Sequence, residues 1–164
     1  MEAGLLFFQA RRTSACQRIL TRAAGYFGIE VPDVYTCVQK SDLNNSIARI
    51  LKKRTIIFLV SSAPGPRPEC AGAIFNTLHV PPDETGEPKG ILRLYGDSKV
   101  GYLVESVDQA IVLFPDDPYE ILKMAPKTFA QLKKKFHLPG DFPPKKHPDY
   151  QKLFADAAQA IRED

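Results

Sequence analysis

Cysteine is scarce and long hydrophobic runs are missing from this sequence of 164 residues. The three cysteines, Cys16, Cys37 and Cys70, are odd in number, lie far apart and form no CxxC pair. This pattern argues against a disulfide framework or a structural zinc site and favours a reducing compartment. No apolar run approaches the roughly 20 residues that a transmembrane helix needs. We therefore expect a cytoplasmic protein with no membrane partner.

A large excess of charge of one sign is also absent. The formal net charge of +3 comes from 22 basic and 19 acidic side chains spread along the chain, far less than in dedicated nucleic-acid binders. Nucleic acid is therefore not an expected partner. The hydrophobic content of 44% is enough for one good core at this length, and no internal repeat divides the chain.

Short apolar runs alternate with segments whose apolar residues recur at helical spacing. Buried strands are expected at residues 5–8, 34–38, 55–60 and 109–114, helices at about 13–27, 41–51, 69–78 and 118–136, and a hairpin at 91–95 and 102–105. The third of these runs is apolar without alternation from residue 56 to residue 59, as when helices cover both faces of a parallel strand. This order predicts a three-layer α/β fold: a mostly parallel, doubly wound sheet with helices on both faces and a small edge hairpin.

The chain divides into an α/β domain over residues 1–137 and a tail over residues 138–164. The tail begins with a Pro- and Lys-rich connector that reaches Pro148. Apolar residues then recur at helical spacing at Tyr150, Leu153, Phe154, Ala157, Ala158 and Ile161. Such a stripe predicts an amphipathic helix, which we expect to pack on the same domain.

Two loops are placed where ligands collect in an open parallel sheet, outside the carboxyl ends of the strands. They cover residues 61–70 and 115–120. Each follows a buried strand and leads into a helix, so its backbone amides and the helix N-terminus offer a site for an anion.

The same two loops resemble those of the molybdopterin-binding fold, which molybdenum-cofactor biosynthesis proteins share with the amino-terminal domain of competence-damage-inducible proteins. That family has T-G-G-x-G-P-T-x-D-D where residues 61–70 read SSAPGPRPEC, and L-P-G-x-P-x-E where residues 114–120 read FPDDPYE. The resemblance covers roughly residues 4–137. It implies binding of a pterin or nucleotide phosphate between the loops with the help of Mg²⁺. It also implies a homo-oligomer, because proteins of this fold often form dimers or trimers.

The resemblance assigns candidate roles to individual residues of the two loops. Ligand-binding candidates are Ser61, Ser62, Gly65, Arg67, Asp117 and Glu120. Glu69 and Asp116 are the catalytic candidates, and together with Asp117 they are the candidate Mg²⁺ ligands, because hard cations prefer carboxylate oxygens. Arg67 could hold a phosphate or carboxylate in two-point fashion through its guanidinium.

Three departures from the family pattern oppose its usual ligand. Ser62 and Ala63 replace the paired glycines, and their Cβ atoms hinder the close backbone approach that holds a phosphate. Glu69 and Cys70 replace the paired acids, which leaves one carboxylate for a metal that wants two. Asp116 replaces a glycine and puts negative charge where an anionic ligand would lie.

Asp116 and Asp117 allow two interpretations. Adjacent carboxylates at the end of a strand can hold Mg²⁺ for phosphoryl chemistry. We favour the alternative that Asp117 caps the next helix, with Pro118 at its first position and Glu120 at the third, while Asp116 faces water. Cys70 could be a nucleophile at a helix N-terminus, but no histidine lies near it in sequence, which favours a buried thiol.

Three functions follow, in order of preference. The first is a binding module with a degenerate active site that holds a molybdopterin-like or nucleotide phosphate without catalysis. The second is an enzyme, either a Mg²⁺-dependent nucleotide pyrophosphatase or a molybdenum-cofactor biosynthesis enzyme, that uses Glu69, Asp116, Asp117 and Glu120. The third is a non-catalytic, oligomeric interaction protein.

Overall fold

The computed structural model describes residues 1–145 and 148–163, which form one sheet and five helices. The strands are β1 (Glu2–Phe8), β2 (Glu30–Cys37), β3 (Ile56–Ser61), β4 (Leu92–Tyr95), β5 (Val100–Glu105) and β6 (Ala110–Pro115). The helices are α1 (Thr13–Tyr26), α2 (Lys40–Leu51), α3 (Ala71–Thr77), α4 (Pro118–Phe136) and α5 (Tyr150–Glu163). No helix in the described ranges combines the length and apolar character needed to cross a bilayer.

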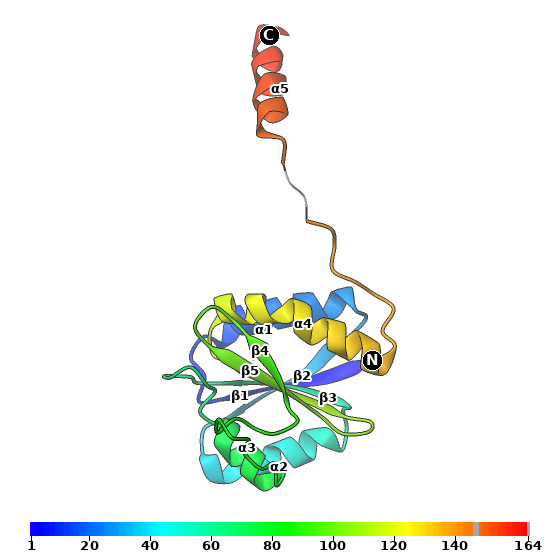
Figure 1. Ribbon diagram of the computed structural model, residues 1–164. Coiled ribbons are helices and arrows are strands. Elements are labelled where there is room, and N and C mark those ends of the chain that lie inside the picture. Colours follow the sequence, from blue (N-terminus) through cyan, green and yellow to red (C-terminus); the bar gives the residue numbers. More distant parts are fainter. Residues whose placement is uncertain (146–147, 164) are drawn as a thin grey trace.

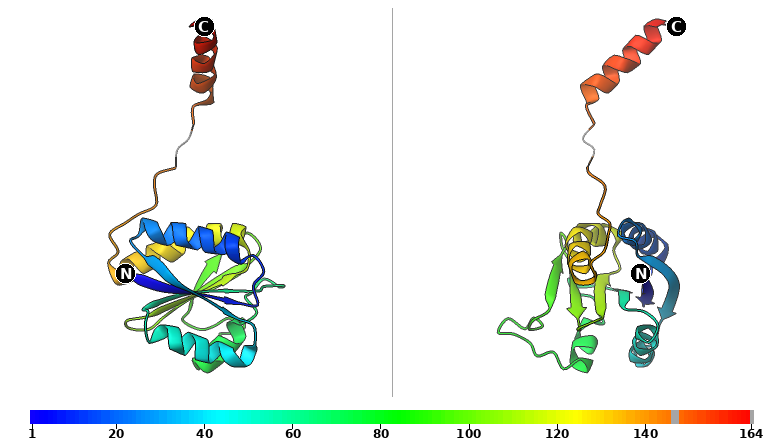
Figure 2. Two further views of the ribbon diagram at one scale, coloured as in Figure 1. Left: turned by 180° about the vertical axis from the view of Figure 1, so that it is seen from behind. Right: turned by 90° about the vertical axis from the view of Figure 1, so that its right-hand side faces the viewer.

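The six strands form a single sheet in the order β2-β1-β3-β6-β5-β4. Neighbours among β2, β1, β3 and β6 run parallel, whereas β5 and β4 are antiparallel and form a hairpin at one edge. Helices α1 and α4 cover one face of the sheet, and α2 and α3 cover the other (Figures 1 and 2). The predicted three-layer, doubly wound fold with an edge hairpin is confirmed.

The central strands are buried on both faces, which explains why their sequences do not alternate. Every residue of β3 and β6 is buried. On the α1 and α4 side, the rings of Phe27 and Phe129 stack 5.2 Å apart, and the ring of Phe58 lies 5.8 Å from that of Phe129. On the α2 and α3 side, Leu6 and Leu59 belong to a second core. The two cores fix the sheet between the helical layers.

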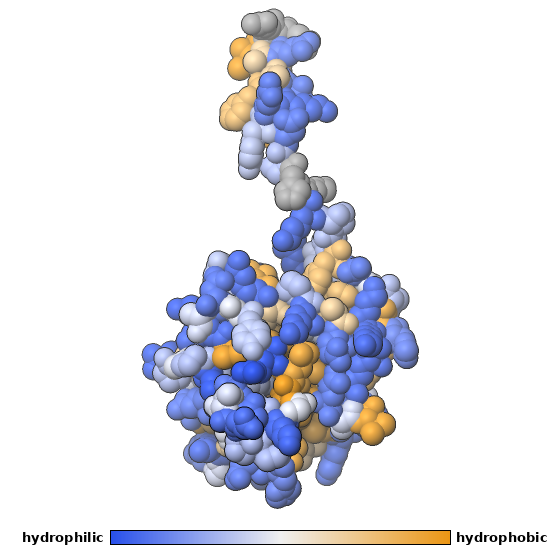
Figure 3. All heavy atoms as spheres, in the orientation of Figure 1, coloured by the Kyte–Doolittle hydropathy of each residue, from blue (hydrophilic) through white to orange (hydrophobic). Residues whose placement is uncertain are grey.

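The carboxyl-terminal helix departs from what the sequence suggested. The amphipathic helix exists as α5, but every one of its side chains from Tyr150 to Ile161 is exposed. It stands clear of the sheet domain (Figures 1 and 3), so the expected packing on the same domain is not formed. The domain's own helices already cover both faces of the sheet. A stripe of apolar residues predicts that a helix packs against an apolar surface, but it does not identify that surface.

Candidate functional site

A pocket of about 500 Å³ opens at the carboxyl ends of the parallel strands. Its walls come from the loops that follow β1, β3 and β6; the residues are Gln9, Arg11, Ser62, Ala63, Pro64, Glu69 and Asp116. Strands β1 and β3 are neighbours, yet the chain leaves β1 for α1 on one face and leaves β3 for α3 on the other (Figure 1). The pocket thus lies at a point where the strand order reverses, as expected for a ligand site in an open α/β sheet. We call it the carboxyl-edge pocket.

Asp116 binds the backbone amides of the two residues just before α1, Arg11 and Arg12, which we call the α1 amides. Its Oδ2 accepts a hydrogen bond from the backbone N–H of Arg11 at 2.6 Å, and its Oδ1 accepts one from that of Arg12 at 3.1 Å. The first turn of α1 contains no acidic residue of its own. Because unpaired amides and the helix dipole favour negative charge at this end, the carboxylate of Asp116 sits where a bound anion would otherwise lie.

The thiol beside this carboxylate is held in its neutral form. Cys16 lies on the buried face of α1, with its Sγ 3.7 Å from Oδ1 of Asp116. Burial, together with the charge of Asp116, raises the pKa of Cys16 to about 12. The thiol therefore acts as a weak donor to the carboxylate and is not a nucleophile at neutral pH.

Ser62 and Glu69 are joined across the mouth of the loop that follows β3. The Oγ of Ser62 donates to Oε2 of Glu69 at 2.7 Å, and the backbone N–H of Glu69 donates to the carbonyl of Ser62 at 2.8 Å. Glu69 is exposed and lines the carboxyl-edge pocket. A carboxylate has about four acceptor positions, so the hydrogen bond from Ser62 leaves most of them open to a ligand.

Other parts of the same loop are structural. Ser61 is buried, and its Oγ accepts from the backbone N–H of Cys70 at 3.4 Å. Lys99, in the turn between β4 and β5, donates from Nζ to the carbonyls of Ala63 at 2.6 Å and Gly65 at 3.1 Å. Ser61 and Gly65 therefore shape the loop and do not line the carboxyl-edge pocket.

Asp117 caps α4, which is the interpretation that the sequence favoured. Its Oδ1 accepts from the backbone N–H groups of Tyr119 at 3.1 Å and Glu120 at 3.3 Å. Pro118 takes the first helical position, where its missing N–H costs nothing. The carboxylate of Asp117 is thereby used for folding, and the residue does not line the pocket. Asp116, by contrast, does not simply face water, because the α1 amides bind it.

Glu120 is buried and holds the turn between β4 and β5. Its carboxylate accepts from the backbone N–H groups of Asp97 at 2.7 Å and Ser98 at 3.0 Å, and from the Oγ of Ser98 at 2.8 Å. Burial alone would raise the pKa of Glu120, but the donors of Ser98 and Asp97 outweigh it and the pKa is lowered. Glu120 does not line the carboxyl-edge pocket.

Arg67 points to the other side of the loop. Its guanidinium lies over the ring of Tyr102, 5.6 Å from the ring centre, and the residue lines a separate hollow beside Phe75 and Val80. The two-point anion grip that the sequence suggested is therefore not directed into the carboxyl-edge pocket. Of the eight candidate residues, the structure brings only Ser62, Glu69 and Asp116 together at the carboxyl-edge pocket.

A magnesium site does not fit the groups present. Within residues 1–145 and 148–163, no three His, Cys, Asp or Glu side chains lie together as a metal ion would require. Asp116 is bound to the α1 amides and Asp117 caps α4, so Glu69 has no carboxylate partner for a cation. Cys70 is buried, and its burial raises its pKa to about 11, which leaves it unreactive.

Two pocket residues lie outside the two loops that the sequence singled out. Gln9 and Arg11 follow β1, the strand beside β3, so their loop ends at the same edge of the sheet. The buried run at residues 5–8 gave the signal, because all parallel strands of one sheet end at one edge. Gln9 has a φ of 52°, in the left-handed region, and it turns the chain sharply at the end of β1.

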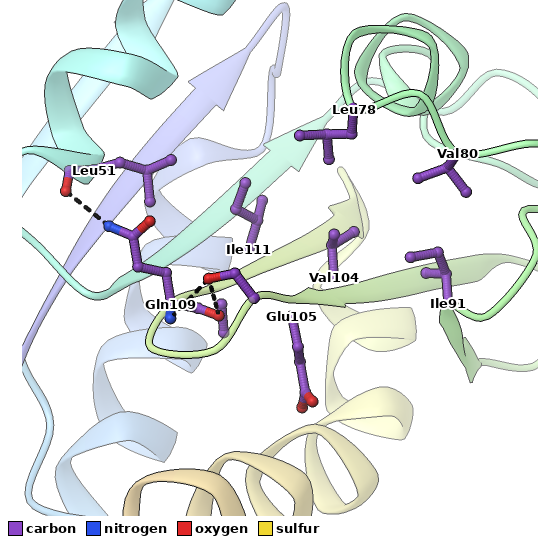
Figure 4. A pocket seen from close by; sticks show the side chains of 10 residues that line it. Leu51, Leu78, Val80, Ile91, Val104, Glu105, Gln109 and Ile111 are labelled. Atoms are coloured by element: carbon purple, nitrogen blue, oxygen red, sulfur yellow. Dashed lines mark hydrogen bonds between the residues drawn. The ribbon is translucent and has the colours of Figure 1, made fainter.

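A second hollow, of about 300 Å³, lies at the opposite edge of the sheet (Figure 4). Its labelled lining is mostly aliphatic, from Leu51, Leu78, Val80, Ile91, Val104 and Ile111. The Nε2 of Gln109 donates to the carbonyl of Leu51 at 3.0 Å, and Glu105 points toward α4, where it accepts from Gln131. This hollow is therefore mainly an apolar surface.

Comparison with known proteins supports the fold and goes no further. No protein-family model matches the sequence, and no curated protein matches it significantly. Among solved structures, the chain is similar to the crystal structure of CinA, a protein with unknown function from Thermoplasma acidophilum. The TM-score is 0.61 at 10% sequence identity, and the match covers 82% of this chain and 96% of that one. The chain therefore has a CinA-like α/β fold, which agrees with the fold that the two loop motifs suggested.

Proposed function

We propose that this chain is a non-catalytic binding module that takes a small heterocycle with amide or amino N–H donors in the carboxyl-edge pocket. Pterins and guanine nucleotides share such an edge, which carries an N–H and an amino group side by side. The observation that carries the proposal is the position of Asp116, whose carboxylate accepts from Arg11 and Arg12.

Asp116 changes which end of a ligand the pocket can hold. The backbone amides of Arg11 and Arg12, beside the start of α1, would offer a phosphate hydrogen-bond donors if they were free. Here those amides already pair with a carboxylate, and a phosphate beside it would meet like charge in a site partly shielded from water. A ligand held through Mg²⁺ and phosphate thus does not fit, and we derive no catalytic step through either group.

Glu69 supplies the complementary group for the proposed ligand. A carboxylate is acceptor-only when ionised and pairs with two parallel N–H donors in bidentate fashion. Arg11 also lines this pocket. The volume of about 500 Å³ lies within the range of small-molecule sites and suits a two-ring heterocycle.

Calorimetric titration tests the proposal with four probes: guanosine, GMP, a simple pterin and inorganic phosphate, each with and without Mg²⁺. We expect guanosine or the pterin to bind without metal, and inorganic phosphate alone not to bind. Glu69→Gln should weaken binding about 10- to 100-fold, the worth of a charged hydrogen-bond pair. Glu84→Gln, an exposed acid outside the pocket, is the matched control.

Two results would overturn the proposal. One is binding of all four probes that is unaffected by Glu69→Gln. The other is Mg²⁺-dependent turnover of a nucleotide, measured as release of phosphate or pyrophosphate, since the proposed module has no turnover to lose. That second result would favour the pyrophosphatase hypothesis instead.

A further inference from the structure

An apolar groove runs along the outer surface of α1 and α4, on the side away from the sheet. It has a volume of about 650 Å³, and its lining residues are Ile19, Arg22, Ala23, Tyr26, Leu122, Ala125, Pro126, Phe142, Pro143 and Lys145. Leu122 is 54% exposed, although it lies among apolar neighbours. We call this surface the helical groove. The proposed ligand site does not use it.

The same chain carries a helix without a partner. Along α5, Tyr150, Leu153, Phe154 and Ile161 lie on one face, and Phe154 and Ile161 are each 75% exposed. Figure 3 shows apolar residues gathered on one side of this helix and hydrophilic residues on the other. An amphipathic helix that presents such residues to water is typical of a segment that docks in an apolar groove.

The geometry points to a reciprocal exchange between two copies of this chain: α5 of each copy docks in the helical groove of the other. A helix of 14 residues is about 21 Å long, the same as α1, so α5 matches the length of the helix that lines the groove. Small residues at the floor, Ala23 and Ala125, leave room for the large side chains of α5. A two-fold arrangement would make the contact twice and close the assembly as a dimer.

The connector favours a partner's groove over the chain's own. It is fixed to the domain at Gly140, where a Cβ would clash with the carbonyl oxygen of Tyr26, and at Phe142, whose ring packs 4.9 Å from that of Phe27. From there the sequence reads PPKKHP, and its prolines restrict the backbone to extended conformations. These restrictions disfavour a tight turn that would bring α5 back to the groove of its own chain.

Light scattering after size exclusion tests the exchange on the full chain. We expect a dimer of twice 18.3 kDa. Phe154→Asp and Leu122→Asp should each raise the dimer dissociation constant about 30-fold or more, as expected for loss of a central apolar contact. Both residues are exposed in the single chain, so both variants should keep its fold. Gln159→Asp, which adds the same charge to the opposite face of α5, is the matched control.

Mixing the two variants distinguishes exchange from folding back. A Phe154→Asp copy has an intact groove and a Leu122→Asp copy has an intact α5, so the mixture should form a heterodimer held by one contact. The proposal is overturned by a monomer whose α5 amides are protected from hydrogen exchange, which would mean docking within one chain. It is equally overturned by a monomer with unprotected α5, by a dimer insensitive to both variants, or by a monomer that binds anionic lipid vesicles through Phe154.

Discussion

Removing the Asp116 carboxylate should destabilise the protein and create a phosphate site in its place. The variant Asp116→Ala leaves the N–H groups of Arg11 and Arg12 without their acceptor. Each hydrogen bond to a charged group contributes about 1.5–3 kcal/mol, and two are lost. Because Asp116 is only half-buried, water replaces about half of that contribution, and we expect the free energy of unfolding to fall by about 2–3 kcal/mol. For a chain of this size, the melting temperature should fall by about 5–10 °C.

The second half of the prediction concerns rescue by an anion. With the carboxylate gone, the free amides at the start of α1 become an ordinary anion site. Phosphate at ten times its dissociation constant should raise the free energy of unfolding of the variant by about 1.4 kcal/mol and leave that of the natural chain unchanged. Calorimetric melting in phosphate and in chloride of equal ionic strength measures both effects. An unchanged melting temperature in Asp116→Ala, or equal stabilisation of both proteins by phosphate, would refute the reasoning.

Three further changes test the neighbouring structure. Asp117→Ala removes the cap of α4 and should cost about 0.5–2 kcal/mol in chemical unfolding; no loss would show that the cap is dispensable. Because the pKa of Glu120 is lowered from 4.5, its stabilisation is fully present above pH 4.5 and is lost as pH falls through the folded-state pKa. The melting-temperature gap between the natural chain and Glu120→Gln should therefore narrow below pH 4.5, and a gap that widens there would contradict this sign. Gly140→Ala should lower the free energy of unfolding by about 1–3 kcal/mol, because the added Cβ would clash with the carbonyl of Tyr26. Hydrogen exchange should also become faster at residues 138–142, where the connector leaves the domain.

The layers of the fold could be predicted from the sequence because hydrophobic burial follows local patterns. Continuous apolar runs mark strands that helices cover on both faces, and β3 and β6 are buried along their whole lengths as this rule requires. The cap of α4 was predictable for the same reason, since Asp117 and Pro118 act within one turn of the helix. Element ends were less well defined, because hydrogen-bonded partners decide them: β5 begins at Val100, two residues before the expected strand.

Long side chains of the two loops were harder to place, because their direction depends on contacts distant in sequence. Arg67 lies in the loop that follows β3, but its guanidinium is attracted to the ring of Tyr102 on β5. Glu120 fits the third position of a capping box, yet its carboxylate is bound by the amides of Asp97 and Ser98. In each case a partner more than 20 residues away determines where the side chain points.

The placement of Asp116 shows how one residue can alter a site that several strands build. Asp116 follows β6, and β6 pairs with β3, so the carboxylate must pass the end of β3 to reach the loop after β1. Its backbone N–H, bound to the carbonyl of Ser61 at 2.8 Å, fixes it at that crossing point. A glycine there, as in the resembling family, would leave the α1 amides open to an external anion. The aspartate instead satisfies those amides from within the protein.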